Sequence, residues 1–69
     1  MLMNTNEVER AVALLTDREV SVALKVSRAA LRFWRAHGGG PPWIRLEKRL
    51  VRYPSDKLRE WIERQAEAR

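Results

Sequence analysis

The 69 residues include no cysteine and only one histidine, His37. Neither a disulfide nor a cysteine-ligated zinc can therefore stabilise the fold. A zinc site needs three or four suitable ligands and a catalytic triad needs an oriented base, and one histidine supplies neither. No glycine-rich loop leads from a strand into a helix as in nucleotide-binding sites. We expect a protein that is not an enzyme, with no cofactor, no metal and no small-molecule substrate.

Long hydrophobic runs are also missing. The longest apolar run, residues 11–15, is far shorter than the roughly 20 residues that span a bilayer. Residues 1–6 lack the charged start of a signal peptide. We expect a cytoplasmic location. The length allows one small domain, and the 45% hydrophobic and 33% charged residues are typical of a globular chain.

The net charge of +5 is unevenly distributed along the chain. Residues 25–52 hold eight basic residues and one acid, Glu47, whereas the rest of the chain carries a small negative charge. So concentrated a positive field implies a polyanionic partner, either nucleic acid or an anionic membrane surface.

Two short helices are predicted before a strong break at residues 38–42, Gly-Gly-Gly-Pro-Pro. Thr16 and Glu19 have the spacing of a capping box, and Val20, Ala23 and Leu24 recur with helical spacing after them. Ser27 is a good N-cap for a second helix over residues 28–37. Two short helices with so brief a connection indicate a helix-turn-helix.

The second helix has two distinct faces when its residues are placed at intervals of 100°. Arg28, Arg32 and Arg35 fall within about 60° of one another on one face, and no acidic residue at i,i+4 relieves their charge. We interpret this face as a binding surface. The packing face consists of Ser27, Ala30, Leu31 and Trp34.

Residues 43–53 are predicted to form two short strands joined by a four-residue loop at 47–50. In this register Arg45 faces outward opposite Arg52, and a phosphate between them would remove their repulsion. The inward residues are Ile44 and Leu46, opposite Val51 and Tyr53.

A third helix is predicted to begin at the N-cap Ser55, with Asp56 in its first turn and an apolar repeat at Leu58, Trp61 and Ile62. Residues after Arg64 are expected to fray. At the other end, Val8, Ala11, Val12 and Leu15 have helical spacing, and residues 1–14 form either an extra helix or an arm ordered by a partner. The predicted fold is mainly α with a small β-hairpin, divided into residues 1–14, 15–65 and 66–69.

The aromatic residues have mostly structural interpretations. Trp34, Trp61 and Tyr53 lie on apolar faces and are expected in the core. His37 is expected to cap its helix. The positions of Trp43, Phe33 and Leu50 stay open: Phe33 either covers the hairpin or contacts a neighbour, and Leu50 is a candidate contact between protomers.

An ordered set of motifs carries a family resemblance. The set is Leu15-Thr16-Asp17-Arg18-Glu19-Val20, Val26-Ser27-Arg28, Leu31-Arg32-Phe33-Trp34-Arg35, Gly40-Pro41-Pro42-Trp43-Ile44-Arg45-Leu46, Val51-Arg52-Tyr53 and Leu58-Arg59-Glu60-Trp61-Ile62. It resembles the excisionase and AlpA-type family of MerR-like winged helix-turn-helix proteins. Two positions depart from the pattern, since Glu47-Lys48 stands where the wing tip usually has glycine, and Lys57 where an acid often precedes the last helix's leucine.

The resemblance implies a bacterial DNA-binding protein of a mobile element such as a prophage. Excisionases are recombination directionality factors that bind attachment-site repeats side by side, bend the DNA and steer a tyrosine integrase toward excision. AlpA-type members are transcriptional activators, and the motifs do not separate the two branches. The expected partners are double-stranded DNA, the integrase and further copies of the chain, and no membrane.

In this docking mode the second helix enters the major groove with its N-terminal residues nearest the bases. Arg28 and Arg32 are then the expected base contacts, because an arginine fork bonds guanine O6 and N7 together. Ala29 is placed near a thymine methyl group, and Lys25, Ser27 and Arg35 on phosphates. The expected wing contacts are Arg45, Lys48, Arg49 and Arg52. An adaptor that binds protein or RNA is the alternative from another class.

Overall fold

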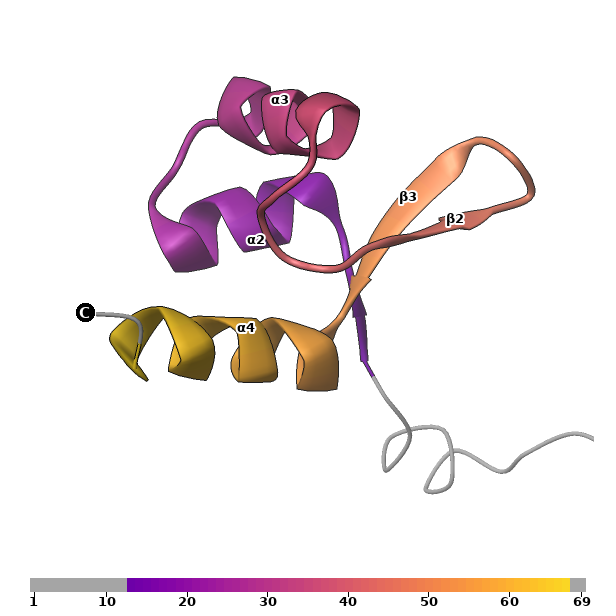
Figure 1. Ribbon diagram of the computed structural model, residues 1–69. Helices are drawn as coiled ribbons and strands as arrows, with labels where there is room; N and C mark the ends of the chain where they lie inside the picture. Colours follow the sequence, from indigo (N-terminus) through magenta and orange to yellow (C-terminus); the bar gives the residue numbers. More distant parts are fainter. Residues whose placement is uncertain (1–12, 68–69) are drawn as a thin grey trace, which may run out of the picture.

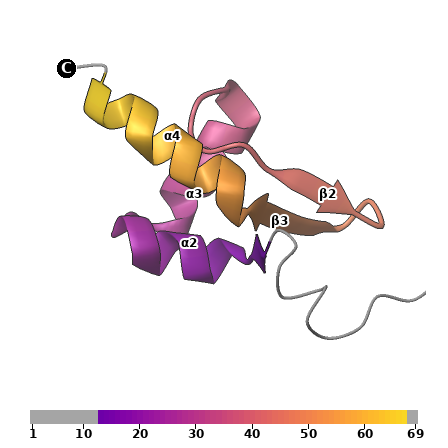
Figure 2. The same ribbon diagram turned by 90° about the horizontal axis from the view of Figure 1, so that it is seen from below.

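The computed structural model describes residues 13–67 and confirms the mainly α, winged helix-turn-helix architecture. Three helices pack beside a small antiparallel sheet, and the hairpin of that sheet projects away from the helices (Figures 1 and 2). No helix in this part of the chain is long and apolar enough to cross a membrane. The elements are β1 (Leu14–Leu15), α2 (Asp17–Leu24), α3 (Arg28–His37), β2 (Ile44–Leu46), β3 (Leu50–Pro54) and α4 (Ser55–Glu67).

Both predicted caps of the helix-turn-helix are confirmed. The Glu19 amide donates to Thr16 Oγ1 at 3.1 Å, and the Thr16 amide donates to Glu19 Oε1 at 2.8 Å. Lys25 ends α2 in the left-handed region, with a φ of 56°. Ser27 Oγ then accepts from the Ala30 amide at 3.0 Å and starts α3. These local bonds satisfy orphan helix-end groups and set the short turn between the helices.

The sheet contains a strand that the sequence pattern did not predict. β3 is central, and β1 pairs with it so that Leu14 lies opposite Pro54 and Leu15 opposite Tyr53. Leu15, which has helical spacing with Val8, Ala11 and Val12, lies in this strand, because the edge of β3 supplies backbone partners for an extended segment. The other residues of that helical spacing, Val8, Ala11 and Val12, lie outside the described residues.

The expected hairpin register is wrong by one residue. The loop has three residues, 47–49, and places Arg45 opposite Val51 and Arg52 opposite Ile44. Glu47 and Lys48 both adopt positive φ, 52° and 64°, and the Arg49 amide donates to the Leu46 carbonyl at 3.0 Å. The chain thus makes a tight turn at Glu47 and Lys48 without glycine, and Arg49 is the third residue of the loop.

A one-residue slip moves side chains to the other face of a strand. Ile44 and Leu46, expected to face inward, instead lie on the same face of the hairpin as Arg52, which we call the outer face. They are 39% and 36% exposed. Arg45 does not oppose Arg52, so the predicted arginine repulsion does not arise. Tyr53 still faces the core, where it is buried as expected.

The core consists of few residues, contributed by α2, α3, β3 and α4. Trp34 and Trp61 pack against it with their rings tilted by 50° and their centroids 6.0 Å apart, which confirms their structural interpretation. Ile62, in contrast, stays exposed. The buried side chains of the core are Val20, Leu31, Tyr53 and Leu58, of which the first three are fully enclosed.

The last helix differs from its prediction at both ends. It begins at Ser55 itself rather than after it, and the Ser55 amide donates to the Ala13 carbonyl at 2.8 Å, which extends the pairing of β1 with β3. Asp56 lies in the first turn, as predicted. The helix continues to Glu67, so residues 65–67, which were expected to fray, are helical.

Candidate nucleic-acid interface

The N-terminal half of α3 presents two arginines and a small residue to solvent. Arg28 and Arg32 are exposed, as is Ala29 between them. Arg28 Nε lies 3.8 Å from Asp17 Oδ2, yet its side chain remains 58% exposed. A loose ion pair of this kind costs little to break, so both guanidinium groups are accessible to a ligand.

Arg35 lies in a different environment from the one its helical position indicated. Its Nη1 donates to Asp17 Oδ1 at 2.6 Å and to the Tyr53 hydroxyl at 2.5 Å, and its side chain is 15% exposed. Burial by itself lowers the pKa of Arg35, but the hydrogen bonds to Asp17 and Tyr53 outweigh it and raise that pKa above its ordinary value. Burial also raises the pKa of Tyr53. Arg35 therefore ties α3 to α2 and β3, and is not an exposed member of the basic face.

Asp17 is the acidic partner that the sequence pattern did not predict. No acid lies at i,i+4 from these arginines on their own helix, and Asp17 is instead the first residue of α2. It reaches Arg28 and Arg35 because α2 and α3 pack against each other. The only sequence signal was an acid in the first turn of a helix, which also has a local explanation in the helix dipole.

The turn between the helices holds the two residues that are expected to contact phosphates. Lys25 and Ser27 are exposed beside the start of α3. The Ser27 oxygen accepts from the Ala30 amide, which leaves its hydroxyl hydrogen available to donate. Lys25 uses its backbone amide to close α2, so its ammonium group plays no part in the cap.

The basic residues of the wing are spread over two faces and a tip. Arg45 lies on the face of β2 that points toward the core side, with its guanidinium carbon 5.3 Å from the centroid of the Trp43 ring. Lys48 and Arg49 are exposed at the tip. Arg52 lies on the outer face and donates from Nη1 to the Val51 carbonyl at 2.8 Å.

Two aromatic residues left open by the sequence now have positions. Phe33 is 58% exposed and stacks on His37 with ring centroids 4.0 Å apart, so it does not cover the hairpin. His37 Nδ1 lies 2.9 Å from the Phe33 carbonyl near the end of α3, as expected of a capping residue. Trp43 is half-buried and packs against the core beside Arg45. Leu50 is exposed, and its contact with a neighbouring protomer stays a prediction.

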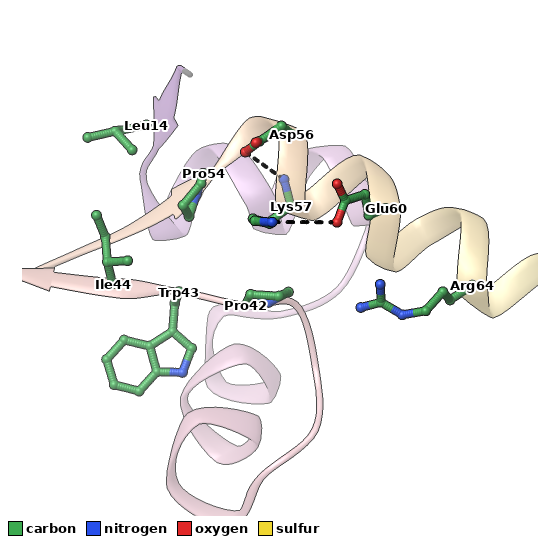
Figure 3. A pocket seen from close by; sticks show the side chains of 9 residues that line it. All are labelled: Leu14, Pro42, Trp43, Ile44, Pro54, Asp56, Lys57, Glu60 and Arg64. Atoms are coloured by element: carbon green, nitrogen blue, oxygen red, sulfur yellow. Dashed lines mark hydrogen bonds and ion pairs between the residues drawn. The ribbon is translucent and has the colours of Figure 1, made fainter. Parts of the chain in front are cut away.

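A hollow of about 670 Å³ lies between the outer face of the sheet and α4 (Figure 3). Ile44 extends into it while Trp43, one residue earlier, extends to the opposite side of the chain. Its charges are mixed, and Lys57 lies 3.8 Å from Glu60 across one turn of α4. Such a lining does not fit a polyanion. Within residues 13–67, no three acidic or histidine side chains gather closely enough to hold a metal ion.

The fold and the exposed arginines on α3 define a DNA-binding helix-turn-helix protein with a basic β-hairpin wing. Comparison with known families agrees: residues 14–66 match the helix-turn-helix domain family, and the chain belongs to that family. No curated protein and no solved structure matches the chain.

Proposed function

We propose that this protein is an excisionase, a recombination directionality factor of a mobile element. It binds tandem sites in attachment-site DNA cooperatively, bends the DNA and promotes excision by a tyrosine integrase. The observation that carries the proposal is the placement of Arg32 of α3 and Arg45 of the wing around one hollow. A duplex that contacts α3 therefore lies within reach of the wing, and the resemblance of the motifs to excisionases supplies the biological role.

The roles of the α3 residues follow from the docking of a recognition helix in the major groove. Arg28 and Arg32, both exposed, contact guanine O6 and N7, and each good bidentate pair contributes about 1–3 kcal/mol of discrimination. Ala29 lies near a thymine methyl group. Lys25 and Ser27 bind phosphates at the turn, and these contacts set the register of the helix on the DNA.

The wing contacts the backbone or the adjacent minor groove through Arg45, Lys48, Arg49 and Arg52. Insertion of the wing bends the duplex, at a deformation cost of order 1–6 kcal/mol. One small domain with a single recognition helix cannot offset this cost well, which favours several copies bound side by side. Circular-permutation gels on the bound site are expected to show a bend, and an unbent complex contradicts the architectural role.

The experiment that tests the proposal is a footprinting titration over the attachment site of the element and over the promoters beside the gene. Protection of tandem attachment-site repeats that grows cooperatively with concentration supports the excisionase role. An excision assay with the integrase then follows. Protection confined to a promoter contradicts that role and supports the AlpA-type transcriptional regulator, which uses the same residues.

A salt titration separates DNA binding from an adaptor that binds protein. Contacts between arginine or lysine and phosphates release counterions, so affinity for a duplex falls steeply with salt. For about six such contacts, we expect a loss of about 10³-fold between 50 and 200 mM salt. An affinity that hardly changes over this range contradicts binding through the basic face.

A further inference from the structure

A second, smaller hollow lies between α3 and the wing. Its volume is about 260 Å³, and no acidic residue lines it. This is below the roughly 300–1,000 Å³ of typical small-molecule sites, so a single charged group suits it better than an organic ligand. Three guanidinium groups from two separate elements meet there. The lining residues are Arg32, Arg35, Ala36, Trp43 and Arg45.

The Trp43 ring holds two of these guanidinium groups in place. The guanidinium carbon of Arg45 lies 5.3 Å from the ring centroid, and that of Arg35 lies 6.0 Å from it. Both distances are within the range of cation–π attraction. Trp43 also packs against the core, so the ring is anchored from behind. The ring of Trp43 therefore contacts both Arg45 of the wing and Arg35 of α3.

The hollow has an uncompensated positive charge. Asp17 neutralises one arginine, since it bonds Arg35 Nη1 at 2.6 Å from outside the lining. Arg32 and Arg45 form no ion pair with an acidic residue among residues 13–67. Two unrelieved cations around one small space repel each other unless an anion lies between them.

We propose that this hollow binds one phosphodiester group of the DNA backbone. Arg45 contacts its oxygens, Arg32 adds positive charge from the α3 side while its guanidinium group contacts a base, and Trp43 acts as the positioning residue for Arg45. The proposal rests on the proposed DNA binding and adds a specific contact to it. Its consequence is that one phosphate fixes the distance between the recognition helix and the wing.

The test combines neutral backbone substitutions with protein variants. A duplex containing the footprinted site receives a methylphosphonate at one position at a time, and binding is measured by fluorescence anisotropy. One substitution is expected to lower the affinity of the unaltered protein by about tenfold, as expected for loss of a charge-assisted hydrogen bond. The same substitution should cost the Arg45→Ala variant less than twofold, because its interaction is already absent.

Arg59→Ala is the matched control for Arg45→Ala, since Arg59 is an exposed arginine on α4 away from the hollow. Trp43→Leu tests the positioning role. Trp43→Leu is expected to bind the unmodified duplex more weakly and to lose sensitivity to the same single phosphate. Trp43→Phe, which keeps an aromatic face, should restore part of that sensitivity. Circular dichroism melting checks that each variant is folded.

The failures are distinguishable. If the unmodified duplex binds but no phosphate position couples to Arg45, the phosphate site is wrong and DNA binding stands. If the Arg45→Ala effect follows the identity of a base instead, Arg45 reads the groove and the proposal is overturned. If the unmodified duplex does not bind, the proposed function fails together with this inference.

Discussion

At the scale of single residues, the close approach of Gly40 to Trp34 shows why a glycine is required at one position of the break. Gly40 has a φ of +75°, and a Cβ there would lie 2.7 Å from Trp34 Cε3 and 2.8 Å from Trp34 Cβ. Gly39 has a φ of +91° but nothing within 4 Å of its Cβ position. A side chain would strain the backbone at either glycine, but it would meet a neighbouring side chain only at Gly40.

Gly40→Ala is expected to lower the free energy of unfolding by about 2–3 kcal/mol, because it adds a steric clash to the backbone strain. Gly39→Ala introduces only the strain and should cost about 1 kcal/mol. Urea denaturation of the two variants measures the difference. Equal losses in the two variants contradict the importance of the contact with Trp34.

At the scale of elements, α2 and the wing are controlled by different local features. The first turn of α2 is closed by the reciprocal bonds of Thr16 and Glu19. The wing turn has no glycine, and Glu47 and Lys48 both adopt positive φ. α2 therefore has a favourable start, whereas the wing turn holds two residues in a region that L-residues rarely adopt.

The capping box predicts a stability contribution that depends on pH. The hydrogen bonds from Thr16 lower the pKa of Glu19 below its ordinary value of 4.5. The lowered pKa in the folded state means that this contribution is present above about pH 4.5 and is lost as the pH falls through the folded-state pKa. The melting temperatures of the unaltered protein and Glu19→Gln should therefore converge between pH 6 and pH 3. A constant difference contradicts the assignment, and Glu63→Gln on α4 is the control.

Lys48→Gly is expected to stabilise the fold by about 0.5–1 kcal/mol, since glycine removes the left-handed strain but also adds freedom to the unfolded chain. Arg49→Gly is the matched control. Arg49 is not among the residues with positive φ, so glycine there only adds unfolded-state freedom and should destabilise. Thermal melts measure both. A destabilised Lys48→Gly variant would contradict strain in the wing turn.

At the scale of the whole molecule, the side chains of Asp17, Arg35 and Tyr53 join α2, α3 and β3. Arg35 bonds both partners through Nη1, and the Tyr53 hydroxyl also lies 3.4 Å from Asp17 Oδ1. This partly buried network connects the recognition helix to the base of the wing. It sets the relative position of the two elements that are proposed to contact DNA.

A double-mutant cycle tests the network. Asp17→Asn is expected to lower the free energy of unfolding by about 1.5–3 kcal/mol, the range for hydrogen bonds to charged groups. The double variant with Asp17→Asn and Tyr53→Phe should lose less free energy of unfolding than the two single variants lose together, with a coupling of at least about 0.5 kcal/mol. Lys57→Ala, which breaks an exposed pair on α4, should cost less than about 1 kcal/mol and show no coupling with Asp17→Asn. Additive losses for Asp17→Asn and Tyr53→Phe refute the network.

The sequence by itself determined the features that depend on neighbouring residues. The caps at Thr16 and Ser27, the break at the glycines, the helical identity of α2, α3 and α4 and the exposed pair Arg28 and Arg32 all follow from local spacing. The tertiary structure alone decided the pairing of β1 with β3, the wing register and the environment of Arg35. These depend on backbone edges, turn geometry and an acid on another helix, which approach one another only when the chain has folded.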